Sequence, residues 1–146
     1  MSTDQSVVFR RYLSAMVLHS LASSEAAGLN ATDYFALNLL DLSGPLTSGD
    51  LARWTGLSTG ATTRMIDRLE ERGHVRRSLD PSDRRKVVVE MAKPPKTVDQ
   101  AVAGARRRLG AVIQSYSESE RQVLFDYFAQ ATVAYQESTQ ELVDRR

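Results

Sequence analysis

Three consecutive cations, Arg84, Arg85 and Lys86, stand inside the stretch LDPSDRRKVVVEM, residues 79–91. They directly follow residues 80–83, DPSD, which are of the types that form tight turns. Cations at an exposed turn can bind an anionic partner. They can also remain solvated and protect an exposed strand edge from aggregation. This stretch alone is compatible with both interpretations.

A second group of candidate residues lies on a predicted helix, TGATTRMIDRLEERG, residues 59–73. A first turn without bulky side chains lets backbone N–H groups and hydroxyls approach phosphates and base edges. An arginine one turn further can offer two donors to guanine or can clamp a phosphate. The residues that could act in this way are Ser58, Thr59, Gly60, Thr63, Arg64 and Arg68.

The opposite side of this helix is apolar enough to pack on other helices, through Thr62, Met65, Ile66 and Leu69. The polar side also has a simpler interpretation, in which Arg64 and Arg68 are solvated and pair with acidic residues three positions on, Asp67 and Glu71. Asp67 also weighs against a purely electrostatic role for this helix.

The helix and the cations at residues 84–86 belong to one short segment, and together they favour binding to double-stranded DNA. A helix in the major groove leaves a neighbouring hairpin near an adjacent minor groove, where arginine is attracted by the concentrated negative potential. The charge distribution agrees. Residues 46–93 hold ten Lys or Arg against seven Asp or Glu, whereas residues 1–45 are net negative and residues 94–146 are balanced.

The composition excludes several other classes of protein. The chain of 146 residues has 42% apolar residues, which predicts one globular domain over residues 1–146. It contains no cysteine, so disulfides, thiolate zinc sites and cysteine catalysis are excluded. His19 and His74 are far apart in the sequence, and we expect no metal and no cofactor. We find no glycine-rich phosphate loop, nucleophile elbow or triad, and therefore predict that the chain is not an enzyme.

No apolar run approaches the length of about 18 residues that spans a bilayer. The first residues, MSTDQSVVFRRY, lack the basic start and apolar stretch of a signal peptide. We therefore expect a cytoplasmic protein without a membrane partner.

The periodicity predicts a series of helices around the candidate residues. Apolar residues recur at helical spacing over residues 6–24 and again over residues 97–115. Capping signals predict four further helix starts, and Gly44, Gly56 and Gly73 predict the ends of three of these helices. The predicted caps, each with its partner three positions on, are Asn30 with Asp33, Thr47 with Asp50, and Ser117 with Glu120, and Ser58 caps the helix that follows Gly56.

The two helices on either side of Gly56 match a helix-turn-helix, because a short glycine-containing turn separates them. After Gly73 the period changes to that of strands, in HVRRSL and RKVVVEM. Val87, Val89 and Met91 alternate with Val88 and Glu90, and residues 80–83 supply the turn. The prediction is a β-hairpin directly after the helix-turn-helix, followed by a break at residues 93–96, KPPK.

Residues 44–91, GPLTSGDLARWTGLSTGATTRMIDRLEERGHVRRSLDPSDRRKVVVEM, resemble the multiple-antibiotic-resistance regulator (MarR) family of winged-helix transcription factors. In that family the residue two places after the hairpin aspartate is commonly an arginine that enters the minor groove. Asp83 and Arg85 occupy those positions here. The family's hairpin usually closes with Leu-Thr and a glycine, whereas this chain has EMAKPP at residues 90–95.

The resemblance implies a mainly α fold with a small β-hairpin wing: a winged helix-turn-helix core at residues 29–93, with dimerisation helices at 1–28 and 96–146. It further implies a homodimeric, ligand-responsive repressor that binds a pseudo-palindromic operator. The apolar residues of the terminal helices fit such a dimer, although they could instead form the core of one monomer. These residues are Phe9, Tyr12, Leu13, Met16, Phe125, Phe128 and Tyr135.

Members of this family often bind small lipophilic or phenolic effectors in a crevice beside the winged region. Tyr34, Trp54 and His19 are candidates to line such a crevice, or they are ordinary core and surface residues. The sequence does not identify an effector. The alternative to a regulator is a winged helix that contacts only other proteins, which would need neither a small first turn nor a cationic hairpin tip.

Overall fold

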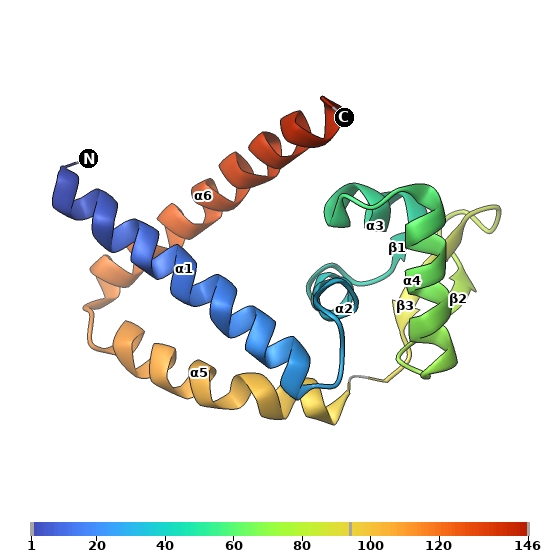
Figure 1. Cartoon of the computed structure of the whole chain (residues 1–146), viewed down its shortest axis with the longest axis horizontal. Helices are drawn as coiled ribbons and strands as arrows, with labels where there is room; N and C mark the ends of the chain where they lie inside the picture. The colour runs from blue at the N-terminus through green and yellow to red at the C-terminus, as the bar shows by residue number, and fades with distance from the viewer. Residues whose placement is uncertain (1, 94, 146) are drawn as a thin grey trace. The chain divides into compact units, whose positions relative to one another are not determined.

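The protein is described by a computed structural model that covers residues 2–93 and 95–145. Over these residues it is mostly helical, with a small three-stranded antiparallel sheet (Figure 1). It divides into two compact units, Met1–Val102 and Ala103–Arg146. The predicted fold class, mainly α with a small hairpin wing, is confirmed.

The first unit holds the sheet and most of the helices. In chain order its elements are α1 (Thr3–Ala26), α2 (Ala31–Ser43), β1 (Leu46–Thr47), α3 (Ser48–Thr55), α4 (Thr59–Glu71), β2 (Val75–Leu79), β3 (Val87–Met91) and the beginning of α5 (Lys96–Gln114). The second unit comprises the remainder of α5 and the long helix α6 (Glu118–Asp144).

The predicted helix caps determine where the helices begin. Thr47 and Ser117 form complete capping boxes, in which each hydroxyl accepts a backbone N–H three positions on and the acidic partner accepts the N–H of the cap. Asn30 also caps its helix, by accepting the N–H of Asp33. The prediction that the Asp33 carboxylate completes a box at Asn30 is wrong, because both of its oxygens accept hydrogen bonds from Arg68.

The glycines end the helices as predicted. Gly44, Gly56 and Gly73 have φ angles of 73°, 67° and 69°. In this left-handed region a side chain would be strained, so glycine lets the chain turn sharply out of α2, α3 and α4.

The sheet contains one strand that the sequence did not predict. Leu46 and Thr47 form β1, which pairs with β3, so the strand order is β1-β3-β2. The predicted hairpin is present as β2 and β3, with Leu79 opposite Val87 next to the turn. β3 is therefore the central strand, and its neighbouring residues Val88 and Val89 are both buried, although they point to opposite faces.

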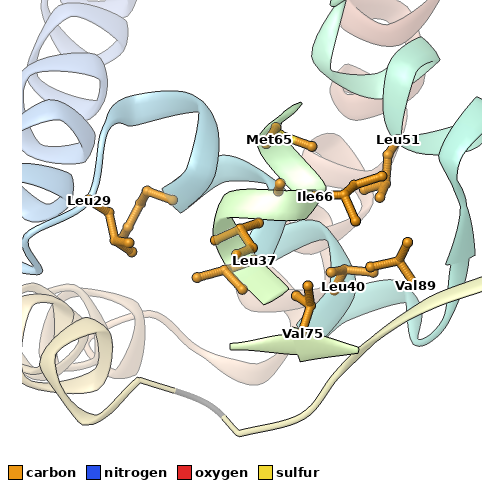
Figure 2. Packing of buried hydrophobic residues seen from close by; sticks show 11 residues of the cluster. Leu29, Leu37, Leu40, Leu51, Met65, Ile66, Val75 and Val89 are labelled. Atoms are coloured by element: carbon orange, nitrogen blue, oxygen red, sulfur yellow. The ribbon is translucent and has the colours of Figure 1, made fainter. Parts of the chain in front are cut away.

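The core of the first unit forms where α2, α3, α4 and the sheet meet (Figure 2). α4 contributes Thr62, Met65, Ile66 and Leu69, all of which are buried, as predicted for its packing side. The other large core side chains are Leu29, which precedes α2, Tyr34, Leu37 and Leu40 from α2, Leu51 from α3, Val75 from β2 and Val89 from β3. This packing fixes α4 with its polar side facing solvent.

The helices near the two ends of the chain bury few side chains. Neither α5 nor α6 has a buried residue, and α1 has only Ser23 and Ser24 among the described positions. Large apolar side chains on α1 and α6, such as Tyr12 and Phe125, are about half exposed.

The predicted break at residues 93–96 includes Pro94, which lies outside the described residues. Among the described helices, none is long and apolar enough to span a bilayer.

Candidate nucleic-acid interface

We call α4 the reading helix. Its solvent-exposed side carries the candidate contacts predicted from the sequence. The Ser58 hydroxyl accepts the N–H of Ala61 and so begins the helix. The Thr63 hydroxyl donates to the carbonyl of Thr59, which holds that side chain against the helix backbone. All six predicted residues of this region are exposed: Ser58, Thr59, Gly60, Thr63, Arg64 and Arg68. The first turn is thus small, polar and open to solvent.

Arg64 lies on the second turn and extends back along the reading helix. A Cβ atom built on Gly60 would lie 3.7 Å from Nη1 of Arg64, so the guanidinium is above the first turn. Arg64 makes no ion pair with a residue in 2–93 or 95–145, and the predicted alternative pairing with Asp67 is absent from these ranges. Its donors can therefore bind a partner outside the chain.

Arg68, by contrast, already has a partner within the chain. Its Nη2 donates to Oδ1 of Asp33 at 2.6 Å and its Nε to Oδ2 at 3.3 Å. Nη1 donates to the carbonyl of Arg64 at 3.4 Å. The hydrogen bond that it donates to the Asp33 carboxylate raises the pKa of the Arg68 guanidinium above its ordinary value. Arg64 and Arg68, both predicted to contact DNA, therefore differ in their partners within the chain. The alternative pairing of Arg68 with Glu71 is absent from residues 2–93 and 95–145.

Two of the three acidic residues of the reading helix, Asp67 and Glu70, are paired with an arginine of the neighbouring strand. Arg77 of β2 donates to Oδ1 of Asp67 at 2.5 Å and to Oε2 of Glu70, and its backbone N–H donates to Oε1 of Glu70. The hydrogen bond to Asp67 is the main reason that the pKa of Arg77 is raised. Because Asp67 is paired in this way, it opposes an anionic partner less than its charge alone suggests.

The loop between β2 and β3, residues 80–86, is the wing loop, and Asp80 organises it. Oδ1 of Asp80 accepts hydrogen bonds from the hydroxyl and N–H of Ser82 and from the N–H of Asp83. The bond from the Ser82 hydroxyl is the main reason that the pKa of Asp80 is lowered. The Asp80 N–H donates to the carbonyl of Lys86 and closes the loop. The predicted turn function of residues 80–83 is confirmed.

Asp83 holds Arg85 at the tip of the wing loop. Oδ1 of Asp83 accepts the backbone N–H and the Nε of Arg85, each at 3.1 Å. The Arg85 side chain is nevertheless 91% exposed, and its neighbours Arg84 and Lys86 are exposed as well. The carboxylate therefore orients the guanidinium without burying it.

The wing loop and the reading helix belong to the same unit and are joined through β2. The Arg77 contacts connect β2 to the middle of α4, and Figure 1 shows the loop projecting from the sheet on the side of α4. Asp33 and Arg77 are supporting residues that the sequence alone did not predict. They lie 35 positions from Arg68 and ten from Asp67, so no local pattern could reveal either contact.

The three residues proposed to line an effector crevice have different surroundings in the described structure. Tyr34 belongs to the core cluster, Trp54 on α3 is 38% exposed, and His19 is an exposed residue whose Nε2 lies 3.4 Å from the Ser23 hydroxyl. A solvent-open hollow of about 480 Å³ lies along α1, and a second of about 40 Å³ lies between α2 and the start of α5. Neither is lined by Tyr34, Trp54 or His19.

Comparisons with known proteins agree with this geometry. The model of the MarR family matches residues 29–87, which contain the reading helix and the wing loop. The chain is 34% identical over 136 residues to the uncharacterised HTH-type transcriptional regulator YcgE of Bacillus subtilis, covering 92% of this chain and 88% of that protein.

Solved structures show the same fold. The structure of RV1404 from Mycobacterium tuberculosis is 25% identical, with a TM-score of 0.60 over 92% of this chain and 94% of that one. The structure of a mutant MepR from S. aureus bound to an oligodeoxyribonucleotide is 16% identical in sequence, with a TM-score of 0.57 over 90% of this chain and 97% of that one.

Proposed function

The chain belongs to the MarR family of HTH-type transcriptional regulators, which are not enzymes, and on this premise we propose that it represses transcription by binding a pseudo-palindromic operator as a homodimer. In this proposal residues 29–93 bind DNA, and the helices of residues 1–28 and 96–146 form the dimer. A two-fold dimer presents two reading helices to successive major grooves and therefore selects an operator with matching symmetry.

The distribution of the arginines is the observation that carries this proposal. Arg64 and Arg85 are exposed, whereas the nearby carboxylates Asp67 and Glu70 are paired with Arg77. We assign Arg64 to a base edge or phosphate in the major groove, and Arg85 to the adjacent minor groove. Arg84 and Lys86 then contact phosphates, as do the small residues near the start of the reading helix, Ser58, Thr59, Gly60 and Thr63.

The direct test is a fluorescence anisotropy titration with the DNA upstream of the protein's own gene and with a scrambled duplex of equal length. Specific recognition predicts that the upstream duplex binds at least about 10³ times more tightly at physiological salt. Equal binding of both duplexes would contradict a sequence-specific regulator. Failure to bind either duplex would instead support a winged helix that contacts only proteins.

A ligand response is the second part of the proposal. The hollow along α1 places the apolar side chains of Val7, Ala15 and Leu18 beside the cations Arg10 and Arg11. This combination suits a small lipophilic or phenolic molecule that carries negative charge. Native mass spectrometry of the purified protein should detect such a molecule, and its addition should weaken binding to the upstream duplex. The ligand response would be contradicted if no added lipophilic acid or phenol altered that binding.

A further inference from the structure

The Arg68–Asp33 ion pair connects two helices that are distant in the sequence. Asp33 lies in the first turn of α2 and is 1% exposed, while the Arg68 side chain on the reading helix is 44% exposed. Two hydrogen bonds join the planar guanidinium to both carboxylate oxygens. A two-point contact of this kind fixes orientation as well as distance.

This contact uses most of the hydrogen-bonding capacity that Arg68 could offer to DNA. Nε and Nη2 face Asp33, and Nη1 faces the carbonyl of Arg64. Withdrawal of the guanidinium toward a phosphate would leave Asp33 as a charged group in a nearly dry site, which is unfavourable. Arg64, one turn earlier, has no such commitment in the described structure.

We propose that Arg68 is a positioning residue, which through Asp33 fixes the orientation of the reading helix on α2 and thereby the placement of Arg64 on DNA. This inference rests on the proposed function and assigns Arg68 a different role from the DNA contact expected from the sequence. Arg77 complements it from the other side of α4 by holding Asp67 and Glu70 to β2. The reading helix is then oriented by ion pairs to α2 and to the wing strand.

The test compares Arg68→Ala, Arg68→Lys and Asp33→Asn with the parent, in titrations with the upstream and scrambled duplexes over a range of salt concentrations. We expect all three to lower the preference for the upstream duplex by about threefold to thirtyfold. The slope of log K against log salt should be unchanged on the scrambled duplex. Asp33→Asn is decisive, because a residue that is 1% exposed cannot contact DNA itself. Arg107→Ala, which removes an exposed arginine on α5, is the matched control.

A phosphate contact by Arg68 predicts a different result and would overturn the inference. Arg68→Ala would then reduce the slope by about 0.9, Arg68→Lys would bind like the parent, and Asp33→Asn would keep the parent's specificity.

Hydrogen exchange provides a measurement that does not depend on DNA. Amides of residues 64–70 should exchange faster in Asp33→Asn than in the parent, while those of α6 remain unchanged, and equal exchange in α4 would also overturn the inference.

If the parent itself does not prefer the upstream duplex, the proposed function fails. The exchange measurement still decides whether Asp33 orients α4. A variant too unstable to titrate with DNA is replaced by Arg68→Lys, which retains the charge but cannot reproduce the planar two-point contact.

Discussion

At the scale of single residues, the arginines near the interface are distinguished by their partners. Arg68 binds a buried carboxylate, Arg77 binds two carboxylates of the reading helix, and the highly exposed Arg85 binds the partly buried Asp83. Exposed ion pairs add little to stability, so the Arg85 pair serves mainly to orient the side chain. Arg64, which has no partner in the described ranges, is the arginine best placed to read a base.

Arg64→Ala should therefore weaken binding to the upstream duplex more than to scrambled DNA. The loss of a two-point contact to a base costs about 1–3 kcal/mol at the specific site. Anisotropy titrations with both duplexes measure the difference, and Arg107→Ala should leave both affinities unchanged. An equal loss on the two duplexes would make Arg64 a phosphate contact.

Arg85→Ala should weaken binding and also remove the preference for a narrow, A·T-rich flank. Arginine favours such grooves because their negative potential is concentrated. Titrations with A·T-rich and G·C-rich flanks measure this preference. The matched variant Arg84→Ala should reduce the slope of log K against log salt by about 0.9 yet retain the preference, as expected for a phosphate contact. If Arg85→Ala behaves like the parent on both flanks, the wing loop is only a solvated hairpin.

The sequence predicted which residues are exposed at the interface but not how they are supported. Ser58, Gly60 and Arg85 follow from local patterns of capping, helix face and turn chemistry. The partners Asp33 and Arg77 depend on how α2 and β2 pack against α4, which a one-dimensional pattern does not contain. For the same reason, the local sequence predicts a capping-box partner at Asp33 and does not reveal its ion pair with Arg68.

At the scale of elements, the junction between the reading helix and β2 is tightly connected. His74 follows Gly73, the glycine just after α4. The backbone N–H of His74 donates to the carbonyl of Leu69, and the carbonyl of His74 accepts the N–H of Ala92. Partial burial, together with the charge of Arg72, lowers the pKa of His74, while Asp33 partly opposes this shift. Protonation of His74 therefore opposes folding.

Stability should fall as the pH decreases through about 6.5, the ordinary pKa of histidine. The unfolded chain then binds a proton that folded His74 resists, so acid favours unfolding. In urea titrations at about pH 7.5 and 5.5, the parent should lose more stability than His74→Gln. Carboxylates with lowered pKa values, such as Asp50 and Glu90, lose their contribution only at more acidic pH. An unchanged dependence in His74→Gln would contradict this assignment.

Helices were easier to predict than the sheet. The helices α1, α2, α3, α4 and α6 each start after a capping residue whose side chain accepts the N–H three positions on. Each sharp end after α2, α3 and α4 has a glycine. β1 contains only Leu46 and Thr47, too few residues to show a strand period, and it exists because it pairs with β3 more than 40 positions later. The burial of both Val88 and Val89 depends on that pairing and could not be predicted without it.

At the scale of the whole molecule, the exposed apolar side chains of the terminal helices are the main feature to explain. α6 presents Phe125, Phe128 and Tyr135 at between 37% and 55% exposure, and α1 presents Tyr12 and Met16 at nearly half. Apolar surface repeated along two long helices is typical of a protein interface. It supports the proposed dimer over the alternative in which these residues form a monomer core.

The protein should accordingly sediment as a dimer, at twice the chain mass of 16.2 kDa, at micromolar concentrations. Phe125→Glu should shift the equilibrium toward monomer, because it places a charge on the apolar face of α6. Circular dichroism of the variant should show that the helices are retained. A parent that remains a monomer would remove the basis for a two-fold operator.

Operator binding by the proposed dimer can be measured by hydroxyl-radical footprinting on the DNA upstream of its own gene. We expect two protected half-sites related by two-fold symmetry, about one helical turn apart, where the two reading helices bind. We also expect protection in the flanking minor grooves that is present for the parent and absent for Arg85→Ala. A single protected patch, or uniform protection without half-sites, would contradict binding by a two-fold dimer.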